Sequence, residues 1–190
     1  MNGRRGMAAA LLLAAAGWAT VAGAAGGFQL RAAHLELEDG VYRLDAGFRL
    51  VLGDTVREAL RNGVPVTVMI EVEVSRPRRW VWDKELVSRR RGRRIEYHPL
   101  TERYVVTRLD GGGHNLARAS FADLGAALDY AGEVHAMPVV RRARLEDGEI
   151  YRVRLRARLA IEALPAPMRL WTRVSREWQL STPWHEMEIP

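Results

Sequence analysis

The sequence predicts a mainly β protein, an antiparallel β-sandwich of immunoglobulin-like architecture with about seven to nine strands and two short helices. Three observations support this prediction. Apolar and polar residues alternate over most of the chain, turns containing glycine separate the alternating runs, and only two short stretches have helical spacing. Because the chain has no cysteine, it can form neither disulfides nor thiolate metal sites, and core packing must hold the fold together.

The first two strands are predicted to form a hairpin. In residues 42–52 apolar side chains occupy every second position, and residues 33–37 before them have the same period. The dipeptide Asp39-Gly40 between the two runs is typical of a two-residue primed turn. That turn pairs apolar residues across the hairpin: Leu37 with Tyr42, Leu35 with Leu44 and Ala33 with Ala46.

The clearest single strand spans residues 64–74, where valine or isoleucine occupies every even position. Glu71 and Glu73 fall on the opposite face of this strand. Neighbouring carboxylates on such a face are expected to be solvated. We therefore do not interpret the two glutamates as the acid and base of a glycosidase.

A second hairpin is predicted where the sequence LEDG recurs at residues 145–148, followed by an alternating strand at 151–161. One more residue separates glycine from tyrosine here than in the first hairpin. We expect a three-residue bulged loop with Gly148 in the left-handed conformation. This loop would place Tyr151 opposite Leu145 and Val153 opposite Ala143.

Two short helices are predicted between the strands. In residues 53–63, Thr55 and Glu58 have capping-box spacing, and Gly63 can end the helix in the left-handed conformation. In residues 119–132 the corresponding residues are Ser120, Asp123 and Gly132. The expected apolar stripes are Val56 and Leu60 in the first helix, and Phe121, Leu124 and Leu128 in the second.

Further strands are expected in residues 94–100, 102–109 and 134–145, and the segment 176–190 predicts one more strand and a tail. The glycine-rich sequence at 110–115 lacks the ending of a phosphate loop and is expected to be a hairpin tip. Residues 164–170 contain two prolines, which favours an extended edge or a connection over a central strand.

The N-terminal segment is typical of a secretory signal peptide. Arg4 and Arg5 precede an uncharged apolar run, and Ala22-Gly23-Ala24 resembles a cleavage site. Cleavage would leave a single domain at residues 25–190, exported to the periplasm. The alternative is an uncleaved segment that anchors the protein to the inner membrane, because residues 7–27 are about long enough to span a bilayer.

The charge of the chain is basic, with a formal net charge of +6. An exported basic protein is expected to meet an envelope protein or an anionic lipid or glycan surface, and not nucleic acid. The oligomeric state is left open by the sequence.

Several stretches in this order resemble the bacterial family called domain of unknown function 4390. They include REALRNGVPV, RRWVWDKEL, IEYHPLTERYVV, LPAPMRL and REWQLSTPW, of which the pattern YHPLTERY at 97–104 is the most distinctive. The resemblance covers nearly the whole chain after the signal peptide. It implies an exported protein of proteobacterial type, and it implies no particular activity.

No catalytic constellation stands out. The five histidines lack metal-site spacing, no serine lies in a nucleophile elbow, and we expect no cofactor, metal site or catalytic residue. His98, beside Pro99, is the most interesting polar residue, and we interpret it as a turn residue. The alternative function is an envelope hydrolase that uses His98 with carboxylates assembled by the fold.

The segment 76–94 is the main functional candidate, because its nine basic and two acidic residues leave a local charge of +7. We expect Trp80 and Trp82 in the core and an arginine-rich hairpin turn beyond them. A non-catalytic binding or accessory module that contacts an envelope component or a membrane protein is the leading hypothesis. The candidate contact residues are Arg79, Arg89, Arg90, Arg91, Arg93 and Arg94.

Overall fold

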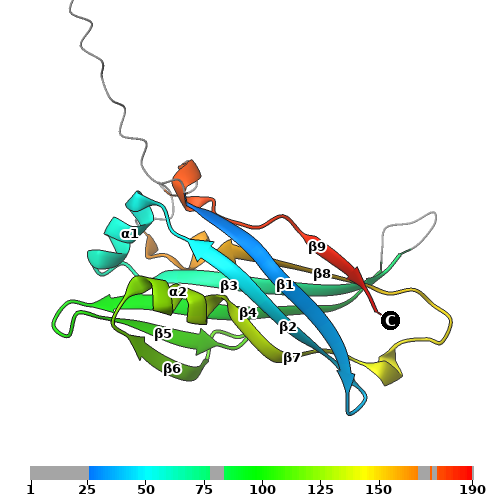
Figure 1. Ribbon diagram of the computed structural model, residues 1–190. Coiled ribbons are helices and arrows are strands. Elements are labelled where there is room, and N and C mark those ends of the chain that lie inside the picture. The colour runs from blue at the N-terminus through cyan, green and yellow to red at the C-terminus, as the bar shows by residue number, and fades with distance from the viewer. Residues whose placement is uncertain (1–25, 78–83, 167–171, 173–174, 190) are drawn as a thin grey trace, which may run out of the picture.

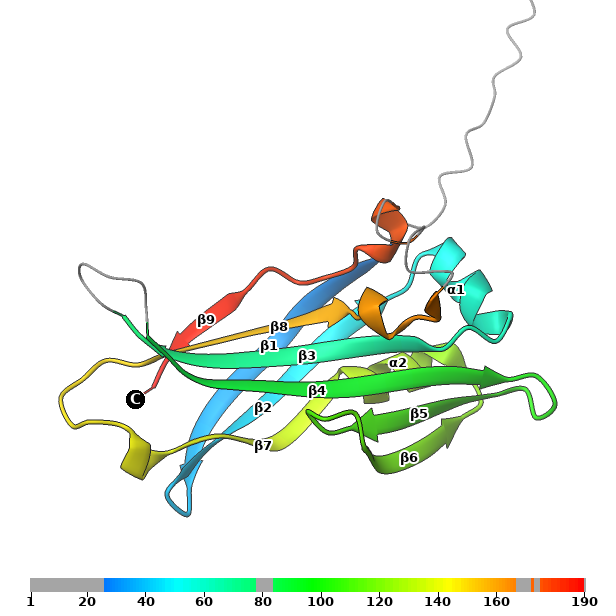
Figure 2. The same cartoon turned by 180° about the vertical axis from the view of Figure 1, so that it is seen from behind.

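Figures 1 and 2 show the computed structural model of the 190-residue chain, which describes residues 26–77, 84–166, 172 and 175–189. The described residues form nine strands in two antiparallel sheets, together with two α-helices. The predicted mainly β fold is therefore confirmed. The three-stranded sheet has the order β1-β2-β7 and lies across the six-stranded sheet, whose order is β6-β5-β4-β3-β8-β9 (Figure 1).

The strands are of unequal length, and β4 is the longest. Their bounds are β1 Gly27–Glu38, β2 Val41–Val51, β3 Val66–Arg76, β4 Lys84–His98, β5 Arg103–Leu109, β6 Asn115–Phe121, β7 Glu133–Arg141, β8 Arg152–Leu159 and β9 His185–Glu188. The helices are α1 Asp54–Arg61 and α2 Leu124–Gly132, with single 3-10 turns at Arg142–Arg144, Ile161–Ala163 and Arg176–Trp178.

The first hairpin has the predicted turn and register. Asp39 and Gly40 both have positive φ, and Leu37, Leu35 and Ala33 pair with Tyr42, Leu44 and Ala46. Positive φ at both central residues is the requirement of a type I′ turn, which the Asp-Gly dipeptide meets at little steric cost. Turn chemistry and apolar alternation therefore specify the same register.

The core lies between the two sheets and is built from the alternating apolar faces. Leu44 and Phe48 of β2 and Ile70 of β3 are almost completely buried, as is Leu155 of β8. Burial of one such side chain contributes about 1.5–3 kcal/mol. The aliphatic residues at even positions of β3 are all buried in the core, as the sequence pattern predicts: Val66, Val68, Ile70, Val72 and Val74.

The helices form where predicted, but their N-termini differ from the prediction. Gly53 is the N-cap of α1 and provides no side-chain cap, so the capping box of Thr55 and Glu58 is wrong. In α2 the carboxylate of Asp123 is the cap and accepts a 2.8 Å hydrogen bond from the Ala126 amide. Ser120 lies in β6 instead, because it pairs with β5.

Gly132 is expected to be essential for the contact between α2 and β2. A Cβ atom at this position would lie 2.3 Å from the carbonyl oxygen of Phe48, which is backbone and cannot rotate away. Gly132→Ala should therefore lower the free energy of unfolding by about 2 kcal/mol. Urea unfolding measures this change in stability. Gly27→Ala is the control, since nothing lies within 4 Å of the Cβ position at Gly27. A loss below about 0.5 kcal/mol in Gly132→Ala would contradict the role given to Gly132.

The second predicted hairpin is wrong, although Gly148 does adopt positive φ. Strand β7 ends at Arg141, a 3-10 turn follows, and β8 begins only at Arg152. The two strands belong to different sheets, and β8 pairs with β3 and β9. The segment around LEDG thus connects the two sheets and does not close a hairpin within one.

The predicted arginine-rich hairpin turn is also wrong. Strand β4 runs without interruption from Lys84 to His98, and Arg89 to Arg94 lie in its middle, paired with β3. The tip of the β3–β4 hairpin and the predicted residues Arg79, Trp80 and Trp82 lie outside the described residues. Within the part of the chain that is described, no helix is long and apolar enough to cross a membrane.

Candidate anion-binding groove

The inner face of β4 carries three arginines where a sandwich strand would carry apolar residues. Side chains alternate along a strand, and paired residues of neighbouring strands share a face. Arg89, Arg91 and Arg93 pair with three fully buried aliphatic residues of β3, so they point inward. Val87 and Ile95, at either end of this inward series, are buried in the core. The arginines thus interrupt an otherwise apolar face.

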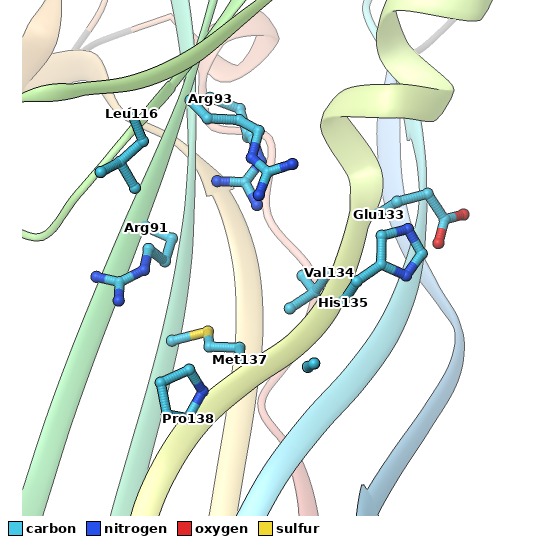
Figure 3. Close-up of a pocket in the computed structure, with 10 residues that line it drawn as sticks. Arg91, Arg93, Leu116, Glu133, Val134, His135, Met137 and Pro138 are labelled. Carbon is cyan, nitrogen blue, oxygen red and sulfur yellow. The ribbon is translucent and has the colours of Figure 1, made fainter.

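These arginines line a groove between β4 and β7 that consists of two adjoining pockets. The first pocket, of about 210 Å³, lies between β4, β5 and residues 133–138 of β7 (Figure 3). The second, of about 330 Å³, lies between β4, residues 139–141 of β7 and the turn that follows. The six arginines that line the two pockets define the basic groove: Arg89, Arg91, Arg93, Arg108, Arg141 and Arg144.

Arg93 is the most deeply placed of the six, with only 5% of its surface exposed. One guanidinium nitrogen, Nη1, donates to the carbonyl of Gly92 at 3.2 Å, while the buried Nε has no partner. Burial lowers the pKa of Arg93 to about 10, and the positive charges of Arg108 and Arg91 contribute to the shift. The guanidinium therefore remains charged at neutral pH, which is unfavourable for a buried group without a counter-ion.

No carboxylate neutralises the groove among the described residues. None of the six arginines takes part in the ion pairs that the structure shows there. Glu133 borders the first pocket, but its carboxylate lies against Gly47 of β2. His135 also borders it, and its Nδ1 lies 3.9 Å from Asp45 of β2. Figure 3 shows both side chains on the side of β7 away from Arg91.

The arginines of the groove become more buried from one end to the other. Arg89, Arg141 and Arg144 are exposed, Arg91 and Arg108 are half-buried, and Arg93 is buried. Helix α2 leads directly into β7 beside this buried end, and its Tyr130 is near enough to raise the pKa of Arg93. A ligand would therefore enter beside Arg144 and meet its most desolvated contact at Arg93.

The two remaining described candidates of the basic segment face the other way. Arg90 and Arg94 alternate with the groove arginines, so they lie on the outer face of the six-stranded sheet. The Nε atom of Arg90 is 3.7 Å from a carboxylate oxygen of Glu71. The single candidate surface predicted from the sequence is therefore divided between two faces of one strand.

The outer face is a network of ion pairs around Glu71. This residue is only 4% exposed, and its carboxylate accepts hydrogen bonds from Arg156 at 2.7 Å and Arg158 at 3.1 Å. The prediction that Glu71 is solvated is therefore wrong. Its side chain does point away from the core, but arginines of β8 cover it. The geometry assigns it to holding β3 and β8 together.

A tryptophan extends this network. The guanidinium carbons of Arg154 and Arg156 lie 4.8 and 4.3 Å from the ring centroid of Trp184, within the range of cation–π contacts. Arg154 also donates to Glu73 at 2.7 Å. The charges of this network around Glu71 and Glu73 thus compensate one another, whereas those of the groove do not.

His98 lies at the exposed end of β4, where Thr101 donates to its carbonyl oxygen at 3.2 Å through the backbone amide. It does not line either groove pocket, and its imidazole makes no hydrogen bond or ion pair with a described residue. This placement fits the predicted turn residue. It gives the hydrolase hypothesis no support.

Three groove residues were missed by the sequence reasoning. Alternation from Tyr104 through Val106 to Arg108 puts Arg108 on the core-facing side of β5, and this signal was available. Arg141 and Arg144 offer no such signal. They line the groove only because the end of β7 and the 3-10 turn after it lie beside β4 in the folded chain. Across the described ranges, no cluster of three or more histidine, aspartate and glutamate side chains could hold a metal ion.

The described chain is thus a two-sheet antiparallel β protein with an uncompensated cationic groove between its sheets. Residues 25–188 match the family described as domain of unknown function (DUF4390), and the chain belongs to this family. No curated protein and no solved structure matches it. The resemblance noted in the sequence is thereby confirmed, and it assigns no activity.

Proposed function

We propose that the protein is an exported, non-catalytic binding module that takes an acidic, extended segment of a partner protein in the basic groove. The observation that carries the proposal is the buried guanidinium of Arg93, surrounded by further arginines and by no carboxylate of the described residues. A buried unpaired charge lowers the stability of a fold. A negatively charged ligand would remove this penalty and would gain charge-assisted hydrogen bonds.

The shape of the groove supports a polypeptide ligand over a compact headgroup. Strand β7 follows the groove for nine residues, which corresponds to about 30 Å of extended chain. Six arginines distributed over this length match carboxylates spaced along a chain, whereas one lipid phosphate would contact a single cluster. Export, expected from the N-terminal sequence, places such partners in the cell envelope.

The proposal is tested with two double variants of β4 that remove the same charge from opposite faces. The variant with Arg89→Ser and Arg91→Ser removes two positive charges from the groove. The variant with Arg90→Ser and Arg94→Ser removes two positive charges from the outer face only. Binding of a fluorescently labelled acidic peptide, with glutamate and threonine in alternation, is measured by anisotropy at low and high salt. We expect the groove variant to bind at least tenfold more weakly, since each desolvated charge contact contributes on the order of 1–2 kcal/mol.

The outer-face variant should bind within about twofold of the unaltered protein, because its arginines do not reach the groove. Equal losses in the two variants would mean non-specific attraction and would contradict the proposal. Vesicles of phosphatidylcholine with phosphatidylglycerol serve as the second probe. If they bind through the groove arginines while the peptide does not, the ligand is a lipid surface and the polypeptide assignment is wrong.

A further inference from the structure

We infer that the buried end of the basic groove, at Arg93, is a binding site for the free carboxyl terminus of the partner segment, which lies antiparallel to β7. This inference rests on the proposed function and adds the polarity and the terminal group of the ligand. The receiving side chains are Arg91, Arg93 and Arg108, which line the first pocket together.

The groove follows the edge of β7, and this favours an extended ligand. The first pocket is bounded by every residue from 133 to 138 and so follows the strand. The strand is irregular here, since Ala136 has positive φ and its amide donates to Asp45 of β2. Among the strands described, β7 pairs only with β2, which leaves this edge open. Pro138 has no amide hydrogen to donate there, so a full ladder cannot form and the arginines must provide much of the affinity.

Charge determines the direction of the ligand. A segment antiparallel to β7 that enters beside Arg141 has its carboxyl end beside the residue where β7 begins, Glu133. There α2 leads into β7, and the carboxylate would meet Arg93, whose buried Nε lacks a partner. A parallel segment would instead bring an ammonium group to three guanidinium groups, which repel it.

The size and desolvation of the pocket suit a terminal group. Its volume of about 210 Å³ accommodates a carboxylate and one side chain, and its apolar lining includes Leu116, Val134 and Met137. A carboxylate can accept two parallel hydrogen bonds from one guanidinium. Each of its oxygens then keeps a second lone pair that can accept a hydrogen bond from a neighbouring arginine. The partner is therefore expected to carry acidic residues at alternate positions and to end in this pocket.

The test compares two acetylated peptides of equal net charge by isothermal titration calorimetry with the intact protein. One has four glutamates alternating with threonine and a free carboxyl terminus, and the other has five glutamates and an amidated terminus. We expect the free acid to bind at least tenfold more tightly. In Arg93→Met the difference should vanish, and in Arg94→Met, which changes the neighbouring outward-facing residue, it should persist.

Each other outcome has a separate meaning. If both peptides bind equally and still depend on Arg89 and Arg91, the groove binds acidic chains but the terminal site is wrong. If neither peptide binds at millimolar concentration, the proposed function itself is wrong, and this inference fails with it. If inorganic phosphate occupies the pocket at submillimolar concentration while the free acid has no advantage over the amide, the pocket is a phosphate site and the inference is overturned.

Discussion

Arg93→Met is expected to stabilise the protein, by about 2–3 kcal/mol in the free energy of unfolding. Burial and neighbouring charges lower the pKa of the Arg93 guanidinium to about 10, a shift that corresponds to roughly 3 kcal/mol against the folded state. Methionine keeps most of the apolar stem and removes the charge. The melting temperature should rise by roughly 5–10 °C, as measured by calorimetry.

The pH dependence of this effect follows from the direction of the shift. Because the pKa of Arg93 is lower in the folded than in the unfolded chain, the destabilisation is fully present at every pH below about 10. It disappears only as the pH rises further. The stability gained in Arg93→Met should therefore be constant between pH 6 and 8. If Arg93→Met is no more stable than the unaltered protein, the positive charge of Arg93 is already compensated in the folded chain. Arg94→Met, with its outward-facing side chain, serves as the control and should change stability by less than about 0.5 kcal/mol.

Glu71→Gln is expected to have the opposite effect, a loss of about 2–3 kcal/mol. The carboxylate is only 4% exposed and accepts hydrogen bonds from Arg156 and Arg158, with Arg90 at 3.7 Å. Glutamine has nearly the same shape but no charge, so three arginines of neighbouring strands would repel one another without a counter-ion. Urea unfolding at pH 7 measures the loss.

Glu73→Gln provides the matched control for this variant. Its side chain is 17% exposed and, among the described residues, pairs with Arg154 alone, so we expect a loss of about 1 kcal/mol or less. Equal effects of the two substitutions would mean that the network around Glu71 contributes nothing beyond an ordinary surface ion pair. Neither variant changes the groove, so peptide binding should be unaffected.

Local patterns predicted the strands well and the connections between sheets poorly. Asp39-Gly40 specifies its own turn, and the alternation on either side agrees with it, so the register of β1 and β2 follows from the sequence. The repeated LEDG has the same composition but ends in a crossover, because β8 finds its partner in β3, far away in the chain. Such non-local pairing has no signal in a single turn.

The arginine segment was predicted to form a turn, but it lies within strand β4. Glycine within a charged run is typical of turns, yet Gly92 is a strand residue whose absent side chain accommodates Leu109 of β5. A Cβ atom there would lie 3.0 Å from a Leu109 methyl carbon, so close packing and not a positive φ accounts for the residue. Had the segment been recognised as a strand, alternation would have separated Arg91 and Arg93 from Arg90 and Arg94.

The most direct test of the central claim is site-specific photo-crosslinking in the cells that produce the protein. The crosslinker p-benzoylphenylalanine replaces either Leu116, an exposed residue that lines the groove, or Ser88, an exposed residue on the outer face of β4. We predict an adduct from Leu116 that mass spectrometry maps to an acidic segment at the carboxyl terminus of an envelope protein, and none from Ser88. Adducts from Ser88 alone, or from both positions equally, would contradict the assignment of the groove as the binding surface.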